Sequence, residues 1–173
     1  MQIILVGFMG VGKTTVGQLL AQQLGQPFVD LDYEFTMTMG ATPGTYMHQF
    51  SEEQFRIAEY QILKKQLAKP NAVISSGGGI VTLPISRELM TDSNYFVVYL
   101  VSDFEVNIKR LIGDTNARPL VTKLSRNDLH HLWQMRQKHY HTVADLSIDT
   151  NGKTPTTIVE QIINKLNRGK THG

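Results

Sequence analysis

The feature that most constrains this chain is a glycine-rich motif directly after its first apolar run. Residues 7–14 read Gly-Phe-Met-Gly-Val-Gly-Lys-Thr, which fits the pattern G-x-x-x-x-G-K-[ST]. The run before it, residues 1–6, ends in branched side chains typical of a buried strand, and the residues after it have helical spacing. A strand, a glycine loop and a helix in this order predict a P-loop, in which backbone N–H groups and the helix N-terminus surround a polyphosphate.

This motif predicts the donor site. We expect the phosphates of a nucleotide to contact Gly10, Val11, Gly12, Lys13, Thr14 and Thr15. Lys13 would neutralise the β- and γ-phosphates, and Thr14 would bind Mg²⁺. A rival interpretation is a dinucleotide fingerprint, because Asp30 and Asp32 follow the glycines at nearly the spacing of a ribose-binding acid. That fingerprint needs a glycine where Thr15 stands, so the P-loop is favoured.

The rest of the chain alternates between strand and helix patterns. Short runs of β-branched or aromatic residues predict strands in four further segments: 28–31, 72–75, 95–101 and 144–149. Helical spacing begins after loop or capping residues at four places: Gly12, Ser51, Ser125 and Thr154. This alternation predicts an α/β fold, a three-layer αβα P-loop NTPase of the nucleoside-monophosphate-kinase type with a parallel sheet of about five strands.

Size and composition fit one such domain over residues 1–173. The chain is 41% hydrophobic and 18% charged with a net charge of +2, so we expect neither nucleic acid nor membrane as a partner. It has no cysteine, which excludes disulfides and thiolate metal sites. Its first residues match neither a signal peptide nor a membrane span. We therefore expect a cytoplasmic monomer that acts on small molecules.

Two segments break the strand–helix alternation. Residues 36–50 and 113–124 are rich in glycine, proline and polar residues. Segments of that size in a compact α/β domain often form substrate clamps or lids, with ordinary surface connections as the alternative. We expect a substrate-binding excursion at about residues 33–61 and a lid at about residues 112–124.

Several charged residues outside the P-loop are candidates for chemistry. Asp30 and Asp32 follow the second strand and would face one side of it, where acids beside a polyphosphate can handle a cation or a proton. Arg56 could bind a ligand or pair with its helix neighbours Glu52 and Glu59. Arg136 lies on the interior stripe of its predicted helix, so its charge needs a buried partner, which could be a structural carboxylate or a ligand anion.

A run of three glycines, Gly77, Gly78 and Gly79, directly follows the third predicted strand. Three consecutive glycines cost chain entropy that a plain turn would not require. Close approach of a ligand to the backbone explains them better than a turn does.

Together these motifs resemble the shikimate kinase family over about residues 3 to 165. The resemblance is carried, in order, by the P-loop, Asp30-Leu31-Asp32, Phe55-Arg56, Gly77-Gly78-Gly79, Arg118-Pro119-Leu120, Arg136 with Tyr140, and Ala144-Asp145. It departs from the family pattern just before Phe55, where Ser51-Glu52-Glu53-Gln54 replaces an expected Gly-Glu. The resemblance implies transfer of the γ-phosphoryl group of MgATP to a hydroxyl of shikimate.

The resemblance also implies residue roles. Asp30 helps to hold Mg²⁺ through water, and Asp32 orients or deprotonates the acceptor hydroxyl. By this resemblance, the substrate carboxylate is bound by Arg56 and Arg136. The N–H groups of Gly77, Gly78 and Gly79 donate to the carboxylate or the hydroxyls of the substrate. Lid closure brings Arg118 over the transferring phosphate, so the catalytic residues are Lys13, Asp32 and Arg118. The resemblance places adenine between Arg110 and the loop before Pro155.

Three competing functions remain open at this point. One is another P-loop metabolite kinase, such as a gluconate or nucleotide kinase. The second is a nucleotide switch, although Asn164-Lys165-Leu166-Asn167 lacks the final Asp of a guanine-binding motif. The third is a non-catalytic homologue, which the intact Lys13, Asp32 and Arg118 disfavour.

Overall fold

The fold is built on a parallel five-stranded sheet. The structure, a computed structural model, describes residues 1–112 and 123–170. The strands lie in the order β2-β3-β1-β4-β5 and comprise β1 (Gln2–Val6), β2 (Phe28–Asp30), β3 (Val73–Ser75), β4 (Tyr95–Val101) and β5 (Leu146–Asp149). All four neighbouring pairs are parallel. The predicted fold class and all five predicted strands are confirmed.

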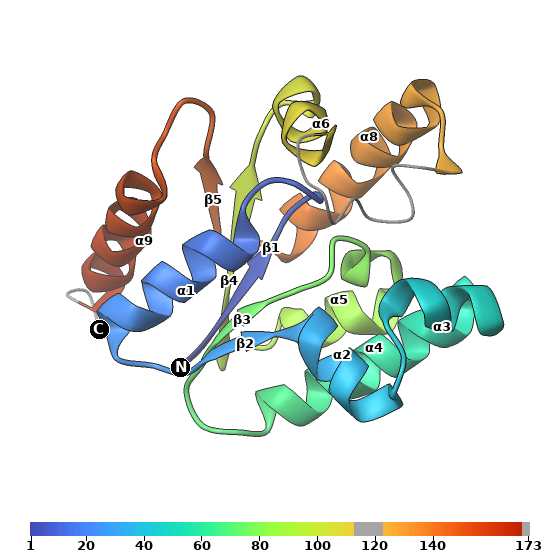
Figure 1. Cartoon of the computed structure of the whole chain (residues 1–173). Coiled ribbons are helices and arrows are strands. Elements are labelled where there is room, and N and C mark those ends of the chain that lie inside the picture. The colour runs from blue at the N-terminus through green and yellow to red at the C-terminus, as the bar shows by residue number, and fades with distance from the viewer. Residues whose placement is uncertain (113–122, 171–173) are drawn as a thin grey trace.

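Helices cover both faces of the sheet (Figure 1). One face carries α1 (Lys13–Leu24) and α9 (Pro155–Lys170). The other carries α4 (Glu52–Leu67), α5 (Pro84–Met90) and α8 (Arg126–Val143). Shorter elements complete the described chain: α2 (Leu31–Met39), α3 (Pro43–Gln49), η1 (Ile80–Thr82) and α6 (Phe104–Ile112).

The central strand β1 shows why the sheet must be covered on both sides. Its side chains alternate between two hydrophobic cores, with Ile4 and Val6 facing α4 and α8 and Ile3 and Leu5 facing α1 and α9. All four are at most 2% exposed. A strand buried on both faces reads as a continuous apolar run, which is the pattern of the N-terminal residues.

Two predicted helix starts have the expected caps. The Ser51 hydroxyl accepts a hydrogen bond from the Gln54 N–H at 3.1 Å, at the start of α4. The Ser125 hydroxyl accepts one from the Asp128 N–H at 3.1 Å, at the start of α8. Such caps satisfy N–H groups that the first helical turn leaves unpaired. The residues that depart from the family pattern before Phe55 therefore form a regular helix start.

One local prediction is wrong. Strand β2 ends at Asp30 rather than at residue 31, and α2 begins at Leu31. Asp30 is the N-cap of this helix, because its Oδ1 accepts from the N–H groups of Asp32 at 2.9 Å and Tyr33 at 3.2 Å. Asp30 and Asp32 are therefore not on one side of a strand. Asp32 lies in the first turn of α2, where its direction is set by the helix.

The strand order places the nucleotide motif at a position where α/β proteins bind ligands. β1 lies between β3 and β4, so the connections leaving β1 and β4 run to opposite sides of the sheet. The carboxyl ends of strands at such a switch point border a crevice. The P-loop follows β1 directly, and α2, the Gly77–Gly79 loop and α6 follow the neighbouring strands.

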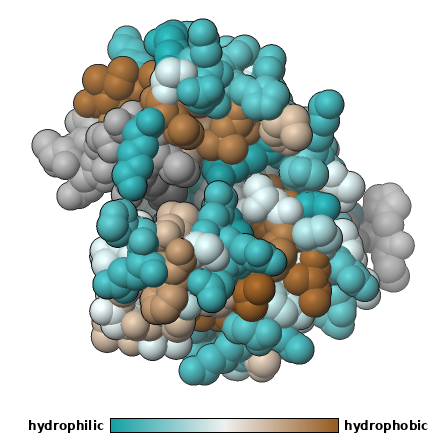
Figure 2. All heavy atoms as spheres, turned by 90° about the vertical axis from the view of Figure 1, so that its right-hand side faces the viewer, coloured by the Kyte–Doolittle hydropathy of each residue, from teal (hydrophilic) through white to brown (hydrophobic). Residues whose placement is uncertain are grey.

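The described surface carries no large apolar area on the side that bears α3. Figure 2 shows that side, where hydrophilic residues predominate and hydrophobic ones form small separate groups. The exposed apolar side chains of α2, α3 and the residue after it are Tyr33, Met37, Met39 and Phe50. In the described residues, no helix combines the length and hydrophobicity that a membrane crossing requires.

Candidate active site

The P-loop has the backbone geometry that its glycines predict. Gly10 and Gly12 adopt φ values of 80° and 103°, in the left-handed region that other residues avoid. A Cβ on Gly10 would also lie 2.9 Å from the Asn107 carbonyl oxygen of α6. Gly12 is the N-cap of α1 and contributes no side chain, and the first turn holds no acidic residue. The helix N-terminus is therefore available to an anion.

Lys13 is buried inside this loop rather than extended into solvent. It is 5% exposed, and its Nζ donates to the carbonyl oxygens of Gly7 at 2.7 Å and Phe8 at 3.2 Å. Its ammonium group is thus held by the backbone of the motif itself. The neighbouring Thr14 and Thr15 are exposed at the start of α1.

Thr14 and Asp30 form a pair of oxygen ligands beside the P-loop. The Thr14 hydroxyl donates to Asp30 Oδ2 at 3.2 Å, while Oδ1 of the same carboxylate caps α2. One hydroxyl and one carboxylate, completed by phosphate oxygens and water, match the usual coordination of Mg²⁺ in nucleotide sites. The described residues contain no cluster of three or more His, Cys, Asp or Glu side chains suited to a metal. The two residues predicted for Mg²⁺ therefore lie together and fit that ion.

A second pocket lies next to the P-loop and has a volume of about 850 Å³. It is lined by Met9 of the P-loop, by the Gly77–Gly79 loop, and by side chains from α2, α3, α4 and α8. The predicted acceptor residues Asp32, Arg56 and Arg136 all line it. The structure thus brings these three residues together, although Asp32 and Arg136 are 104 positions apart in sequence.

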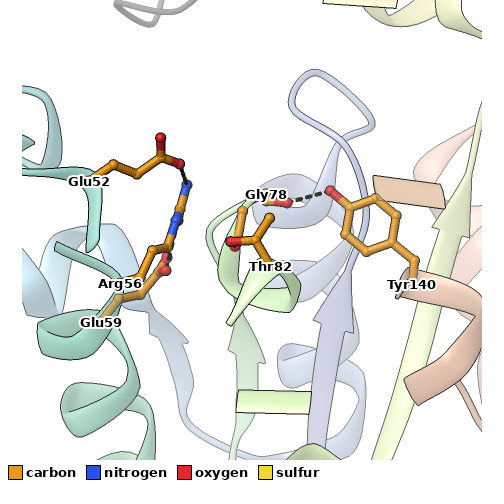
Figure 3. A network of polar contacts seen from close by, with 7 residues as sticks. Glu52, Arg56, Glu59, Gly78, Thr82 and Tyr140 are labelled. Atoms are coloured by element: carbon orange, nitrogen blue, oxygen red, sulfur yellow. Dashed lines mark hydrogen bonds and ion pairs between the residues drawn. The ribbon is translucent and has the colours of Figure 1, made fainter. Parts of the chain in front are cut away.

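Arg56 forms the helix pairs that the sequence left open and also lines the pocket. Its Nη1 donates to Glu59 Oε2 at 2.8 Å, and its Nη2 contacts Glu52 Oε1 at 3.5 Å (Figure 3). Arg56 and Glu59 are buried, whereas the side chain of Glu52 is largely exposed. Glu59 fixes one edge of the guanidinium, and the Nε has no partner within the described residues.

The Glu59 carboxylate, which lines the pocket, has a shifted pKa. Burial raises the pKa of Glu59, the charge of Arg56 opposes this effect, and the nearby Asp32 carboxylate adds to it. Its Oε1 is buried without a hydrogen-bond partner in the described part of the chain. The charge of the adjacent Arg56 therefore stabilises the ionised form of Glu59 against the effect of burial.

Arg136 is buried on α8 as its helical position predicts. It is 3% exposed, and burial lowers the pKa of its guanidinium. Among the described residues it forms no ion pair with a carboxylate, and its Nε has no hydrogen-bond partner. The alternative of a structural carboxylate partner is thus unsupported there. A buried guanidinium facing a pocket is costly unless an anion joins it.

The three glycines are required partly by the protein's own side chains. A Cβ on Gly77 would lie 2.3 Å from Glu59 Oε1, and one on Gly79 would lie 2.0 Å from Arg56 Nη2. A Cβ on Gly78 would make only ordinary contacts, at 3.4 Å or more. Two of the glycines therefore admit the Arg56–Glu59 pair, an approach that the sequence attributed to a ligand alone.

Hydrogen bonds within the described residues engage the carbonyl groups of this loop and not its N–H groups. The Gly77 carbonyl accepts from the Ile80 N–H at 3.2 Å, the Gly79 carbonyl from the N–H and hydroxyl of Thr82 at 3.0 and 2.6 Å, and the Gly78 carbonyl from the Tyr140 hydroxyl (Figure 3). In residues 1–112 and 123–170, no hydrogen bond is donated by the three glycine N–H groups. The loop therefore offers donors to a ligand in the pocket.

The residues predicted around adenine lie near the P-loop and the end of the sheet. Arg110 on α6 donates to the carbonyl oxygens of Gly10 at 3.3 Å and Val11 at 3.1 Å. Pro155 is exposed at the first position of α9. Arg118 and most of the predicted lid, residues 113–122, lie outside the described residues.

Sequence reasoning missed several pocket residues. Glu59 was considered only as a partner of Arg56, although it lines the pocket itself. Met9, Tyr33, His48 and Lys123 also line it without having been singled out. Met9 occupies a variable position of the P-loop motif, and Tyr33 and His48 enter the pocket because α2 and α3 pack against α4. The (i, i+3) spacing from Arg56 to Glu59 was the one available signal.

Comparisons with known proteins show the family to which the chain belongs. The family model described as "Shikimate kinase" matches residues 9–167. A shikimate kinase of Enterococcus faecalis is 39% identical over 95% of this chain and 97% of its own length. The structure "Shikimate kinase from Acinetobacter baumannii in complex with shikimate" is 33% identical, with a TM-score of 0.90 over 98% of this chain and 94% of that one. A gluconokinase structure from Sinorhizobium meliloti, 18% identical with a TM-score of 0.62 over 96% of this chain and 91% of that one, shares the fold alone.

Proposed function

The chain belongs to the shikimate kinase family, and on that premise we propose that it transfers the γ-phosphoryl group of MgATP to a hydroxyl of shikimate, forming shikimate 3-phosphate. The product belongs to aromatic amino-acid biosynthesis. The family assignment supports the phosphotransferase activity, and the pocket beside the P-loop supports an anionic acceptor. The observation that carries the choice of acceptor is the buried Arg136, whose guanidinium lacks a carboxylate partner in the described chain.

The acceptor is held by charge and backbone donors together. The planar guanidinium groups of Arg56 and Arg136 suit a carboxylate, because each can present two parallel N–H donors. Arg56 keeps its orientation through Glu59, at 2.8 Å. The N–H groups of Gly77, Gly78 and Gly79, which donate no hydrogen bond within the described residues, complete the site as donors to the carboxylate or hydroxyls of the acceptor.

Asp32 orients the acceptor hydroxyl and accepts its proton. It lies half-buried in the pocket wall, with its Oδ1 3.3 Å from the position that a Cβ on Gly77 would take. Phosphoryl transfer depends mostly on alignment and charge stabilisation, so orientation by Asp32 is the larger part of its role.

The donor is held by the P-loop. Backbone N–H groups from Gly10 to Thr15 and the N-terminus of α1 bind the phosphates, and the Lys13 ammonium moves from the loop carbonyls to the β- and γ-phosphates. Thr14 and, through water, Asp30 hold Mg²⁺, which supplies positive charge to the phosphate oxygens when bound. Arg110 and the loop before Pro155 bind adenine, so ATP lies across the end of β1.

Two segments predicted from the sequence belong to this proposal. Residues 33–61 form the acceptor-binding excursion, since α2, α3 and the start of α4 supply much of the pocket wall. Residues 112–124 form a lid that brings Arg118 to the transferring phosphate. An arginine supplied in this way can raise the rate by about 10³ or more.

The remaining expectations concern the setting of the enzyme. We propose that the whole chain, residues 1–173, works as one domain, as a cytoplasmic monomer, on ATP and shikimate and without nucleic acid or membrane partners. The near-neutral net charge of +2 and the small, separate apolar groups on the α3 side support this proposal (Figure 2).

An acceptor panel tests the function. ADP release is measured with MgATP and shikimate, beside gluconate, AMP and no acceptor. We expect turnover with shikimate alone. Turnover confined to gluconate or AMP would keep the P-loop chemistry and refute the acceptor assignment. Absence of turnover with every acceptor, with ATP still bound, would indicate a nucleotide-binding homologue.

A further inference from the structure

The Gly77–Gly79 loop is fixed by two hydroxyl groups that lie behind it. Tyr140 on α8 is fully buried, and its hydroxyl donates to the Gly78 carbonyl. Thr82 of η1 donates through its hydroxyl to the Gly79 carbonyl at 2.6 Å. Figure 3 shows Tyr140 reaching Gly78 from the side opposite Arg56 and Glu59. Both bonds engage acceptors of the loop and leave its donors to the pocket.

Tyr140 also connects the loop to the arginine that faces the same pocket. Arg136 and Tyr140 are four residues apart on α8, so they project from one face of the helix. A Cβ on Gly78 would lie 3.7 Å from Arg136 Nη1. One helix thus supplies both the guanidinium of Arg136 and the hydrogen bond that fixes the Gly78 carbonyl next to it.

We propose that Tyr140 and Thr82 are positioning residues for the acceptor. Their hydroxyls hold the carbonyls of Gly78 and Gly79, so that the N–H groups of the loop and the Arg136 guanidinium keep fixed positions relative to each other in the pocket. This proposal rests on the proposed function for the identity of the acceptor. Neither Tyr140 nor Thr82 lines the acceptor pocket, and each hydroxyl donates its proton to a loop carbonyl. Losing one of them therefore weakens acceptor binding and leaves the P-loop unchanged.

The kinetic test compares Tyr140→Phe, Thr82→Val and a matched control, Tyr99→Phe. Tyr99 is 2% exposed, and its ring lies 5.0 Å from that of Tyr140. Within the described residues its hydroxyl makes no hydrogen bond to the loop, so Tyr99→Phe removes a neighbouring tyrosine hydroxyl that does not hold the loop. We expect Tyr140→Phe to raise the KM for shikimate about tenfold. The KM for ATP and kcat should stay within about twofold of wild type, and Tyr99→Phe should resemble wild type.

Thr82→Val should show the same split with a smaller rise, about threefold, because the Thr82 N–H still bonds the Gly79 carbonyl. It also carries the test if Tyr140→Phe does not fold. An equal rise in both KM values, or no rise for shikimate in either variant, would overturn the proposal.

A second readout does not depend on the acceptor. The N–H groups of Ile80 and Thr82 bond loop carbonyls, so their hydrogen exchange measured by NMR reports opening of the loop. We expect faster exchange at Ile80 in Tyr140→Phe and no change in Tyr99→Phe. If the wild-type protein does not phosphorylate shikimate, the proposed function fails while this exchange still decides whether Tyr140 holds the loop. Unchanged exchange, or faster exchange without weaker acceptor binding, would overturn the positioning role.

Discussion

The donor and acceptor halves of this site are built in opposite ways. The P-loop is one continuous stretch, residues 7–15, that offers mostly backbone groups, and its buried cation already has partners in two loop carbonyls. The acceptor pocket draws on α2, α4, the glycine loop and α8, and its buried Arg136 has no carboxylate partner in the described chain. The buried charge of the P-loop is thus compensated by the loop itself, whereas the buried charge of the acceptor pocket carries an electrostatic cost that an anion would offset.

The largest effects should come from removing the charges that act on the transferred group. Lys13→Ala should lower kcat at least about a thousandfold, because charge at the phosphates dominates this chemistry. Shikimate binding without nucleotide, measured by calorimetry, should stay within about twofold of wild type if the two halves are independent. Wild-type turnover in this variant would contradict the P-loop assignment.

Asp32→Asn is the corresponding change in the acceptor half. It removes the proton acceptor while keeping size and shape, so kcat should fall by about 10² to 10⁴. Binding of a non-hydrolysable ATP analogue should be unchanged. A wild-type rate would show that the acceptor hydroxyl reacts without a carboxylate at position 32.

Arg136→Met should separate binding from stability. The variant loses a charged donor to the acceptor, so the KM for shikimate should rise about a hundredfold with little change in the KM for ATP. It also removes a buried charge that lacks a carboxylate partner, so the free energy of unfolding without ligand should rise by about 1–2 kcal/mol. Urea titrations with and without shikimate measure both. A selective rise in the KM for ATP would contradict the carboxylate role.

Gly79→Ala and Gly78→Ala test how closely the acceptor pocket is packed. The new Cβ at position 79 would meet the Arg56 guanidinium, whereas the one at position 78 would make ordinary contacts. We expect Gly79→Ala to lower the free energy of unfolding by about 1–3 kcal/mol and Gly78→Ala to change it little. Thermal melts of the two unliganded variants decide this, and equal melting temperatures would refute the account of the glycines.

The smallest effect concerns the pH dependence of stability. Because burial raises the pKa of Glu59 in the folded state, folding favours its protonated form. Its contribution is therefore most favourable below the ordinary glutamate pKa and is lost as pH rises through the raised value. The stability of wild type relative to Glu59→Gln should increase as pH is lowered from 8 toward 5. A difference that is constant with pH would show that Glu59 titrates normally.

The two halves also differ in how far the sequence predicts them. The P-loop could be predicted residue by residue, because its function depends on local backbone conformation at glycines such as Gly10 and Gly12. The burial of Arg136 was predictable as well, since its spacing from Leu129 places it on the interior face of α8. Both predictions use information carried within one element.

Tertiary packing and local competition account for what was missed. Asp30-Leu31-Asp32 fits a strand end and a helix start equally well, and the decisive interaction is the Asp30 side chain bonding the backbone of α2. The need for Gly77 and Gly79 arises from Glu59 and Arg56 on α4, which approach only after the helix packs on the sheet. Neither effect leaves a periodic signal in the sequence.

The most direct test is an experimental structure of the protein with shikimate and a non-hydrolysable MgATP analogue. We predict that the shikimate carboxylate lies within hydrogen-bond distance of the guanidinium groups of Arg56 and Arg136. One acceptor hydroxyl should lie between Asp32 and the terminal phosphate held by Lys13. A carboxylate bound elsewhere, with either arginine left unpaired, would contradict the account of how the two halves of the site work together.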